Sequence, residues 1–419
     1  MESGIWPKGN IVMCLHLCCS IYRSHYIQAH IWLKMIDFVH IYPKAQLLNL
    51  YSDECMKLFN RYKAGLLILL WMFSHGVQTA FASNAEQQAA QKAALKIQEI
   101  YDRHQLQLTP KRKAHYALRM YRLTGQEKYV SEIINHVYRL VARVSWYDEH
   151  VKDEKFRLQI TDDLTSRFGQ KSRDQLRSRF WQQTEFKALR FELHSVYLLA
   201  QLNQLGIKPT HFSNLLHHLQ KQPLAKILLD ESFIRVYAAQ AANYVFWLEE
   251  LGIASLPEKF IRKFKEIYPK TKDSELSQLE YQNKLYGLTH IVLAASRYYQ
   301  KSVDAERFQW VTAYFVSTLD TIEKRAKADV LAEIGVCLKL VDYSDQMVIH
   351  RLKRRLLAKI DKTHHIIPGV DGDVSLSAGE HRNVLTYAFF NWPKQLITGP
   401  DLTQTPAWRR QLPYRLSLD

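Results

Sequence analysis

The chain has 419 residues, of which 47% are hydrophobic and 23% charged, with only 14 Gly and 12 Pro. This composition is typical of a folded globular protein and excludes a disordered or collagen-like chain. The formal net charge is +16, and residues 1–82 hold 7 of the 57 basic and 4 of the 41 acidic residues, so residues 83–419 keep +13. This surplus attracts polyanions such as acidic polysaccharide, anionic lipid or nucleic acid, although it also serves solubility alone.

Residues 56–82 have the layout of a secretory signal peptide. Three basic residues precede the apolar stretch 64–73, and Ala80-Phe81-Ala82 forms a small-x-small cleavage site before the next residue. The apolar stretch is much shorter than the roughly 20 residues that span a membrane, so we expect no permanent membrane anchor. The sequence therefore predicts export to the periplasm or to the outside of the cell.

Residues 1–55 precede this signal, although a signal peptide has to lie near the start of its chain. We therefore interpret them as a spurious extension, with the true start at Met56. The alternative is a genuine segment in which Cys14, Cys18 and Cys19 bind a metal, but no second cluster of ligands supports it. Residues 83–419 contain only Cys337 and can form no internal disulfide, which suits an oxidising compartment.

From residue 83 onward, apolar residues recur with the period of an α-helix, as in residues 85–104, and no segment alternates like a strand. This pattern predicts a single all-α domain over residues 83–419. Similar short sequence segments, each typical of the end of a helix, recur with their last residues near 125, 207, 253, 300, 343 and 392.

The distance from Gly206 to Gly252 is 46 residues, and a period in the forties accommodates two helices and two turns. We therefore predict an array of antiparallel helical hairpins. Such an array either stacks as an open solenoid or closes on itself. About six hairpins suffice for a ring, and we favour a complete or incomplete α/α toroid.

Two segments are rich in basic residues. Residues 144–190 form either a solvated helix face or an anion-binding rim made by Arg167, Arg173, Arg177 and Arg179. Residues 350–359 contain a second basic run. Aromatic residues do not interleave with these runs as they do in nucleic-acid-binding modules, so we expect no nucleic-acid partner.

Three C-terminal segments place polar residues within otherwise apolar helices, and we consider them the best candidates for a pocket. In residues 286–300, His290 interrupts an apolar helix, and Tyr286 lies one turn earlier. In residues 327–340, Asp329, Glu333 and Cys337 follow one another at i, i+4 and i+8. They therefore share one side of a helix, which faces either a pocket or the solvent.

The third segment, residues 371–392, is the richest in functional groups. Glu380, His381, Arg382 and Asn383 stand at the start of a predicted helix, where backbone N–H groups favour anions. The alternative is a capped helix start whose charges are solvated. The sequence thus predicts Glu380, His381, His290 and Asp329 as catalytic residues, and Arg382, Asn383, Tyr286 and Glu333 as binding residues.

Cofactor and metal signatures are absent from the sequence: there is no phosphate-binding loop, no nucleophile elbow and no HExxH. A zinc site formed by His290, Cys337 and His381 is conceivable, but ligands so far apart in sequence carry little specificity. We therefore predict neither a cofactor nor a metal.

At YGLTHIVLAAS, DVLAEIGVC and GEHRNVL the sequence resembles an uncharacterised bacterial domain-of-unknown-function family of exported all-helical proteins. The three motifs lie in the last third of the chain, and the helical layout extends the likeness over most of residues 85–400. The resemblance implies a helical fold and no particular activity. The architecture is similar to α/α toroids, which host hydrolases, lyases, cyclases and prenyltransferases, so fold cannot select a function.

The leading hypothesis is a periplasmic enzyme that processes an anionic or carbohydrate polymer. In it a His or Tyr is the base, a carboxylate is the acid, and Arg382 with Asn383 holds an anionic group. The alternative is a non-catalytic envelope protein that recognises an acidic glycan, a lipid headgroup or a protein partner. An acidic or neutral glycan is the expected ligand, and the sequence does not indicate an oligomeric state.

Overall fold

The computed structural model describes residues 85–413 and residue 416. The chain divides into two units, residues 1–79 and 80–419. The first unit lies outside the described residues. It includes the predicted start at Met56, most of the predicted signal peptide, and Cys14, Cys18 and Cys19. Within the second unit the described residues form helices and no strand, which confirms the all-α class. No helix in this part of the chain is long and apolar enough to cross a membrane.

The first described helix covers residues 85–103 and leads into a succession of helices of very different length. In chain order they are α4 (Pro110–Thr124), α5 (Val130–His150), α6 (Glu154–Ser166), α7 (Ser172–Gln183), α8 (Arg190–Asn203), α9 (Ser213–Gln220), α10 (Leu224–Leu228), α11 (Glu231–Glu250), α12 (Pro257–Ile267), α13 (Gln278–Ala295), α14 (Ala305–Ser317), α15 (Leu319–Arg325), α16 (Ala328–Leu340), α17 (Gln346–Leu357), α18 (Leu376–Phe390) and α19 (Pro406–Arg409).

The long helices end just before the positions that the sequence predicts. Helix α4 ends at Thr124, and Gly125 follows with a φ of 69°. Helix α11 ends at Glu250, and Gly252 has a φ of 67°. Glycine adopts this left-handed conformation without a steric penalty, so it stops a helix and turns the chain back. The repeated endings in the sequence therefore mark real hairpin turns.

Two kinds of helix alternate toward the C-terminus. Helices α13, α16 and α18 are buried around almost their whole circumference. Helices α12 and α17 bury one stripe and expose the other. A helix without a polar face is stable only when other helices surround it. The polar residues of α13, α16 and α18 consequently lie in the protein interior.

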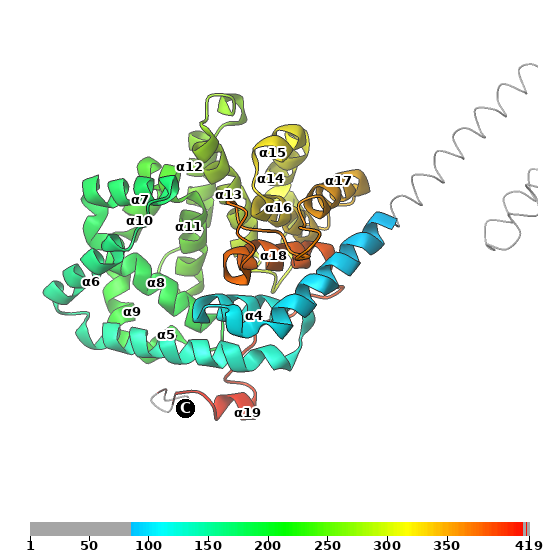
Figure 1. Cartoon of the computed structure of the whole chain (residues 1–419). Coiled ribbons are helices and arrows are strands. Elements are labelled where there is room, and N and C mark those ends of the chain that lie inside the picture. Colours follow the sequence, from blue (N-terminus) through cyan, green and yellow to red (C-terminus); the bar gives the residue numbers. More distant parts are fainter. Residues whose placement is uncertain (1–84, 414–415, 417–419) are drawn as a thin grey trace, which may run out of the picture. The chain divides into compact units, whose positions relative to one another are not determined.

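Neighbouring helices contact one another in a continuous order. Helix α4 packs on α5, α5 on α8, α8 on α11, α11 on α13, α13 on α16, and α16 on α18. The last of these packs back against α4, as Figure 1 also shows. Hydrogen bonds secure this junction: the hydroxyl of Tyr101 donates to the carbonyl of Leu376 at 3.0 Å. The N-terminal helices therefore contribute side chains to the region around α18.

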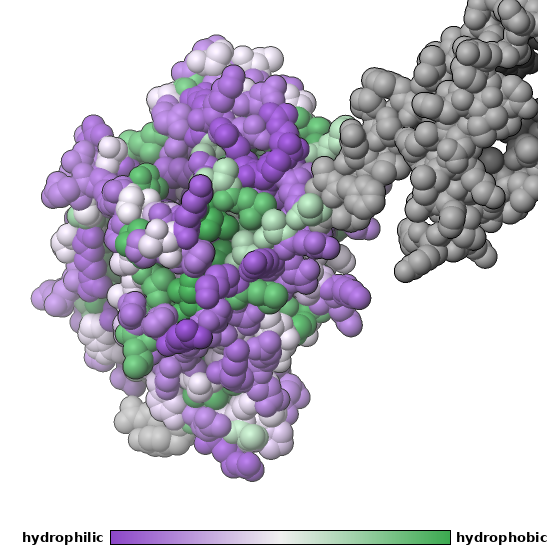
Figure 2. All heavy atoms as spheres, turned by 45° about the vertical axis from the view of Figure 1, so that its right-hand side comes forward, coloured by the Kyte–Doolittle hydropathy of each residue, from purple (hydrophilic) through white to green (hydrophobic). Residues whose placement is uncertain are grey.

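The face of the molecule shown in Figure 2 is mainly hydrophilic, with hydrophobic residues visible between the polar ones. Most of the large apolar side chains of the described residues are instead buried in one core. Close packing extends to the backbone, since a methyl group added at Gly335 of α16 would lie 2.5 Å from the ring of Phe389 in α18. This close contact fixes α16 and α18 relative to one another, and these two helices carry most of the predicted site residues.

Candidate functional site

Three imidazoles and three carboxylates from four helices form a connected group, here called the polar cluster. It consists of His115 on α4, His290 on α13, Asp329 and Glu333 on α16, and Glu380 and His381 on α18. Both glutamates and Asp329 are buried, while the three imidazoles remain partly exposed. Buried carboxylates are costly unless they are paired, so their partners determine what the cluster can do.

Glu333 joins two of the imidazoles. Its side chain is 1% exposed and accepts a hydrogen bond from the hydroxyl of Thr289 at 2.6 Å. Its Oε1 lies 3.6 Å from Nε2 of both His290 and His381. Burial on its own raises the pKa of Glu333, but the two imidazoles outweigh this effect and hold the pKa well below its usual value. Glu333 is therefore a fixed negative charge.

Glu380 has a similar role on the opposite side of the cluster. Its side chain is fully buried, its Oε1 lies 2.7 Å from Nδ1 of His115, and its Oε2 lies 3.5 Å from Arg112. Burial raises the pKa of this carboxyl, but His115, His381 and Arg112 together lower it further than burial raises it. Glu380 is thus an ionised hydrogen-bond acceptor that orients His115.

Burial lowers the pKa of His115 to about 4. The nearby charges of Arg119 and His381 lower it as well, whereas Glu380 raises it by a smaller amount. The ring is consequently neutral at physiological pH. Since Nδ1 faces a carboxylate, Nδ1 carries the proton and Nε2 does not. Nε2 accepts a hydrogen bond from Nε–H of Arg119 at 3.4 Å. His115 thus has the tautomer of a general base, and its Nε2 becomes available when Arg119 donates to another acceptor.

His381 differs from His115 in the direction in which its pKa is shifted. Burial lowers its pKa, but Glu333, Asp329 and Glu380 more than compensate, so the pKa is raised above its usual value of 6.5. The two rings lie 5.4 Å apart between centroids. An imidazole with a lowered pKa and one with a raised pKa thus stand side by side, and separated pKa values of this kind mark a base and an acid.

Asp329 and Tyr286 form a second buried pair. The phenol donates to Oδ2 of Asp329 at 2.5 Å, and burial together with the two carboxylates nearby raises the pKa of Tyr286 well above its usual value. The other oxygen, Oδ1, is buried and has no hydrogen-bond partner among the described residues. Arg173 lies 4.7 Å above the Tyr286 ring. Tyr286 is therefore a donor and not a base.

His290 is held from both sides. Its Nδ1 lies 3.1 Å from Oδ1 of Asn243 and 3.2 Å from the hydroxyl of Tyr298, while its Nε2 faces Glu333. Burial raises the pKa of Tyr298 above its usual range. A cavity of about 200 Å³ reaches His115, Arg119, Asn243 and Tyr298. Through His115, the cluster therefore borders a space that a ligand can enter.

A family model described as a domain of unknown function (DUF3541) matches residues 90–418. The chain belongs to the DUF3541 family. The predicted resemblance to an uncharacterised family is thereby confirmed. Neither a curated protein nor a solved structure matches the chain.

In this DUF3541 protein, five of the eight predicted site residues belong to the polar cluster, and Tyr286 adjoins it through Asp329. The other two are engaged elsewhere. Asn383 is fully buried, and its amide bonds to the backbone of Ile367 and Gly379. Arg382 donates to the carbonyl of Pro368. These contacts stabilise the loop before α18, so neither side chain is presented as a ready anion clamp.

The conceivable zinc site does not form. Cys337 is fully buried, burial raises its pKa well above the usual value, and its thiol donates to the carbonyl of Thr289 at 3.5 Å. Across the described part of the DUF3541 domain, no three His, Cys, Asp or Glu side chains converge on a position that fits a metal ion.

Sequence reasoning missed the contribution of α4. Arg112, His115 and Arg119 follow one another at i, i+3 and i+7, so they line one face of that helix. This spacing was visible in the sequence. It became meaningful only with the contact between α18 and α4, which brings His115 against a glutamate 265 residues away.

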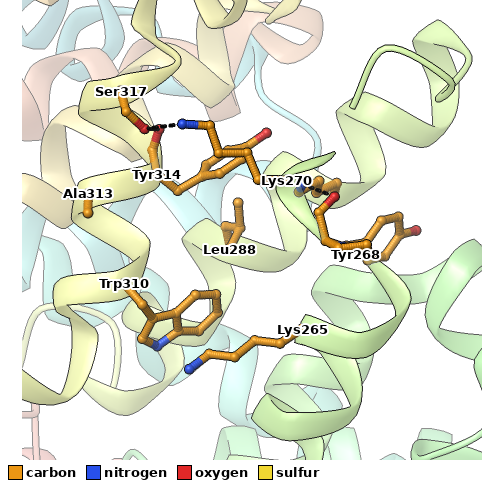
Figure 3. Close-up of a pocket in the computed structure, with 10 residues that line it drawn as sticks. Lys265, Tyr268, Lys270, Leu288, Trp310, Ala313, Tyr314 and Ser317 are labelled. Atoms are coloured by element: carbon orange, nitrogen blue, oxygen red, sulfur yellow. Dashed lines mark hydrogen bonds between the residues drawn. The ribbon is translucent and has the colours of Figure 1, made fainter. Parts of the chain in front are cut away.

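The DUF3541 domain also has a separate cavity of about 440 Å³ between α12, α13 and α14, shown in Figure 3. Leu288 and the rings of Trp310 and Tyr314 line it, and Lys265 lies 4.4 Å above the ring of Trp310. Lys270 donates to Ser317 at 2.9 Å. No member of the polar cluster lines this cavity, and its lysines already have partners.

Proposed function

We propose that this protein is an exported enzyme that cleaves an acidic polysaccharide by β-elimination at a uronate unit. The observation that carries the proposal is the pair of imidazoles 5.4 Å apart, His115 with a lowered and His381 with a raised pKa, of which His115 lines a cavity together with Lys111 and Arg119. Elimination requires a base and an acid on neighbouring atoms of one sugar and a cation that neutralises the carboxylate, and these groups supply all three.

The assignment of roles follows from the hydrogen bonds. A substrate carboxylate that accepts the Arg119 hydrogen bond in place of Nε2 of His115 has its α-carbon close to that nitrogen, because Arg119 donates to it at 3.4 Å in the free protein. Nε2 removes the proton from this carbon, the electron pair forms a double bond to the next carbon, and the glycosidic C–O bond breaks. His381 gives its proton to the departing oxygen. No water, oxidant or cofactor is consumed.

Hydrolysis is the less favoured reaction for this site. Glycosidases of the common kind need one carboxylic acid whose pKa is raised so that it can donate a proton. Glu333 and Glu380 both have lowered pKa values and are buried against imidazoles. They act here as fixed charges that set the protonation of His381 and His115. The acid role that the sequence assigned to a carboxylate therefore passes to His381.

The fold proposal is a closed α/α toroid with the polar cluster in its interior. It is supported by the packing of α18 against α4 and by the burial of α13, α16 and α18 on all sides. The proposed export rests on the signal-like layout of residues 56–82, which suits an enzyme whose polymer substrate lies outside the cytoplasm.

The experiment is an assay of the purified protein with polygalacturonate, alginate, hyaluronan and a neutral glucan. Elimination creates a double bond conjugated with the carboxylate, so we expect ultraviolet absorbance to rise together with new reducing ends, and only with acidic polymers. Reducing ends without absorbance would show hydrolysis and refute the proposed reaction. Saturable, salt-sensitive binding without any product would favour the alternative, a non-catalytic envelope protein that recognises an acidic glycan.

A further inference from the structure

A larger cavity lies next to the one that borders His115. It measures about 530 Å³ and is formed by the start of α4, by α5, by the end of α6 and by α8. Its volume is within the usual range of ligand pockets. Four of its eleven lining residues are lysine or arginine, and none is acidic; we call it the basic cavity. Its cations are Lys111, Arg139, Arg143 and Arg167.

Three of these cations have no carboxylate partner in the described part of the chain. Only Arg167 forms an ion pair, with Asp163, whereas Arg139 donates to the neutral carbonyl of Pro110 at 3.2 Å. Neither Lys111 nor Arg143 forms an ion pair with a carboxylate of the described residues. In a concave surface with low-dielectric walls, uncompensated charges of one sign create a strong field for an opposite charge. The basic cavity is therefore suited to an anion.

The imidazoles of the basic cavity respond to the same field. Burial lowers the pKa of His194 to about 3, and the charges that lower it further are all cationic, among them Arg143 and Lys111. Burial lowers the pKa of His136 to about 4, again with neighbouring cations acting in that direction. Both rings are neutral at physiological pH and leave the positive charge to the lysine and arginine side chains.

The two cavities share part of their walls. Lys111, His136 and Tyr197 line both the basic cavity and the smaller cavity beside His115. A chain bound at His115 can therefore continue into the basic cavity past these residues. A polyuronate offers one charge per sugar unit, which matches a site where cations follow one another along the path.

We propose that the basic cavity is a subsite for the acidic sugar units next to the bond that is cleaved. This inference rests on the proposed function, because it takes the substrate class from it, yet it concerns binding and not the chemical step. Lys111 and Arg143 are the residues that provide affinity for the second and later carboxylates. A single unit or a disaccharide leaves the subsite largely unused.

The test combines Lys111→Gln with Arg143→Gln and measures binding of uronate hexasaccharides and disaccharides by calorimetry. The hexasaccharide panel uses galacturonate, alginate and hyaluronan units, with maltohexaose as the neutral probe. The matched control is Lys226→Gln with Arg262→Gln, which removes the same charge from exposed positions on α10 and α12. We expect the test variant to bind an acidic hexasaccharide about tenfold more weakly or worse, with a smaller loss for the disaccharide, because Lys111 also lines the cavity beside His115, and with little change for the control.

The outcomes separate this inference from the proposed reaction. Loss of hexasaccharide affinity in the test variant alone supports the subsite even if the wild type yields no product. For a protein that does cleave, KM for the hexasaccharide rises in the test variant by a larger factor than kcat changes. Equal losses in both variants would show only a long-range charge effect and overturn the inference. A wild type that binds no acidic hexasaccharide would overturn it as well.

Discussion

Replacement of His115 by alanine lowers turnover of an acidic polysaccharide by a factor of about 10² to 10⁴, which is the usual contribution of a general base. The imidazole is oriented by Glu380 at 2.7 Å and is neutral because burial lowers its pKa to about 4. Neither of two nearby tyrosines can take over, since Tyr286 donates to Asp329 and the pKa of Tyr298 is raised. The measurement is kcat from the ultraviolet absorbance of the product, with circular dichroism to verify the helical content.

The chain offers a matched control for this variant. His218 on α9 forms another pair with a buried glutamate, since its Nε2 lies 3.0 Å from Glu192. It does not line either of the two adjoining cavities. His218→Ala should retain turnover within a few-fold of the wild type. If both variants lose activity equally, His115 acts through stability alone, and if His115→Ala stays fully active, the proposed base is wrong.

Replacement of Glu333 by leucine lowers the free energy of unfolding by about 3 to 5 kcal/mol, the range found when one partner of a buried ion pair is removed. Glu333 is 1% exposed and bonds to Thr289, His290 and His381, so its loss leaves several polar groups without a partner. Urea denaturation gives the value. The control is Glu99→Leu, which removes a half-exposed carboxylate paired with Lys96 and Arg103 and should cost far less, because surface ion pairs contribute little to stability.

The stabilising effect of Glu333 also depends on pH in a defined direction. Because folding lowers its pKa from the usual 4.5, the contribution of the carboxylate is present above pH 4.5 and is lost as the pH falls below that value. Because folding raises the pKa of His381 from 6.5, the stabilising contribution of the protonated imidazole is complete below pH 6.5 and is lost as the pH rises through the raised value. The stability difference between the wild type and Glu333→Gln is therefore largest between these limits. A difference that stays constant from acid to alkaline pH would contradict the ion pair.

Much of the helical framework can be read from the sequence because helix periodicity and chain reversals are local properties. Gly125 and Gly252 stop their helices through a backbone conformation that glycine adopts freely, and no distant residue is needed for that. The i, i+4, i+8 spacing likewise predicts that Asp329, Glu333 and Cys337 share one side of a helix. All three prove to be buried, which decides between the interior and the solvent.

The site itself depends on contacts that local patterns do not contain. Helical spacing shows which residues share a face, but it does not show which other helix that face meets. His115 and Glu380 are 265 positions apart and meet only because α18 packs on α4. In the same way, residues 379–383 give no indication that the side chain of Asn383 forms hydrogen bonds with the backbone of Ile367. A polar residue near a helix start can serve a ligand or the loop beside it, and the pattern looks the same.

The proposed reaction requires one site with two imidazoles of separated pKa, His115 as the base and His381 as the acid. Nitrogen NMR of histidine side chains in the purified protein tests this requirement without any substrate, with His115→Ala and His381→Ala used to assign the signals. We expect His115 to be neutral at neutral pH with its proton on Nδ1, and the titration midpoint of His381 to lie above pH 6.5. A midpoint of His381 at or below 6.5, or a His115 ring that is charged at neutral pH, would refute this pair of roles.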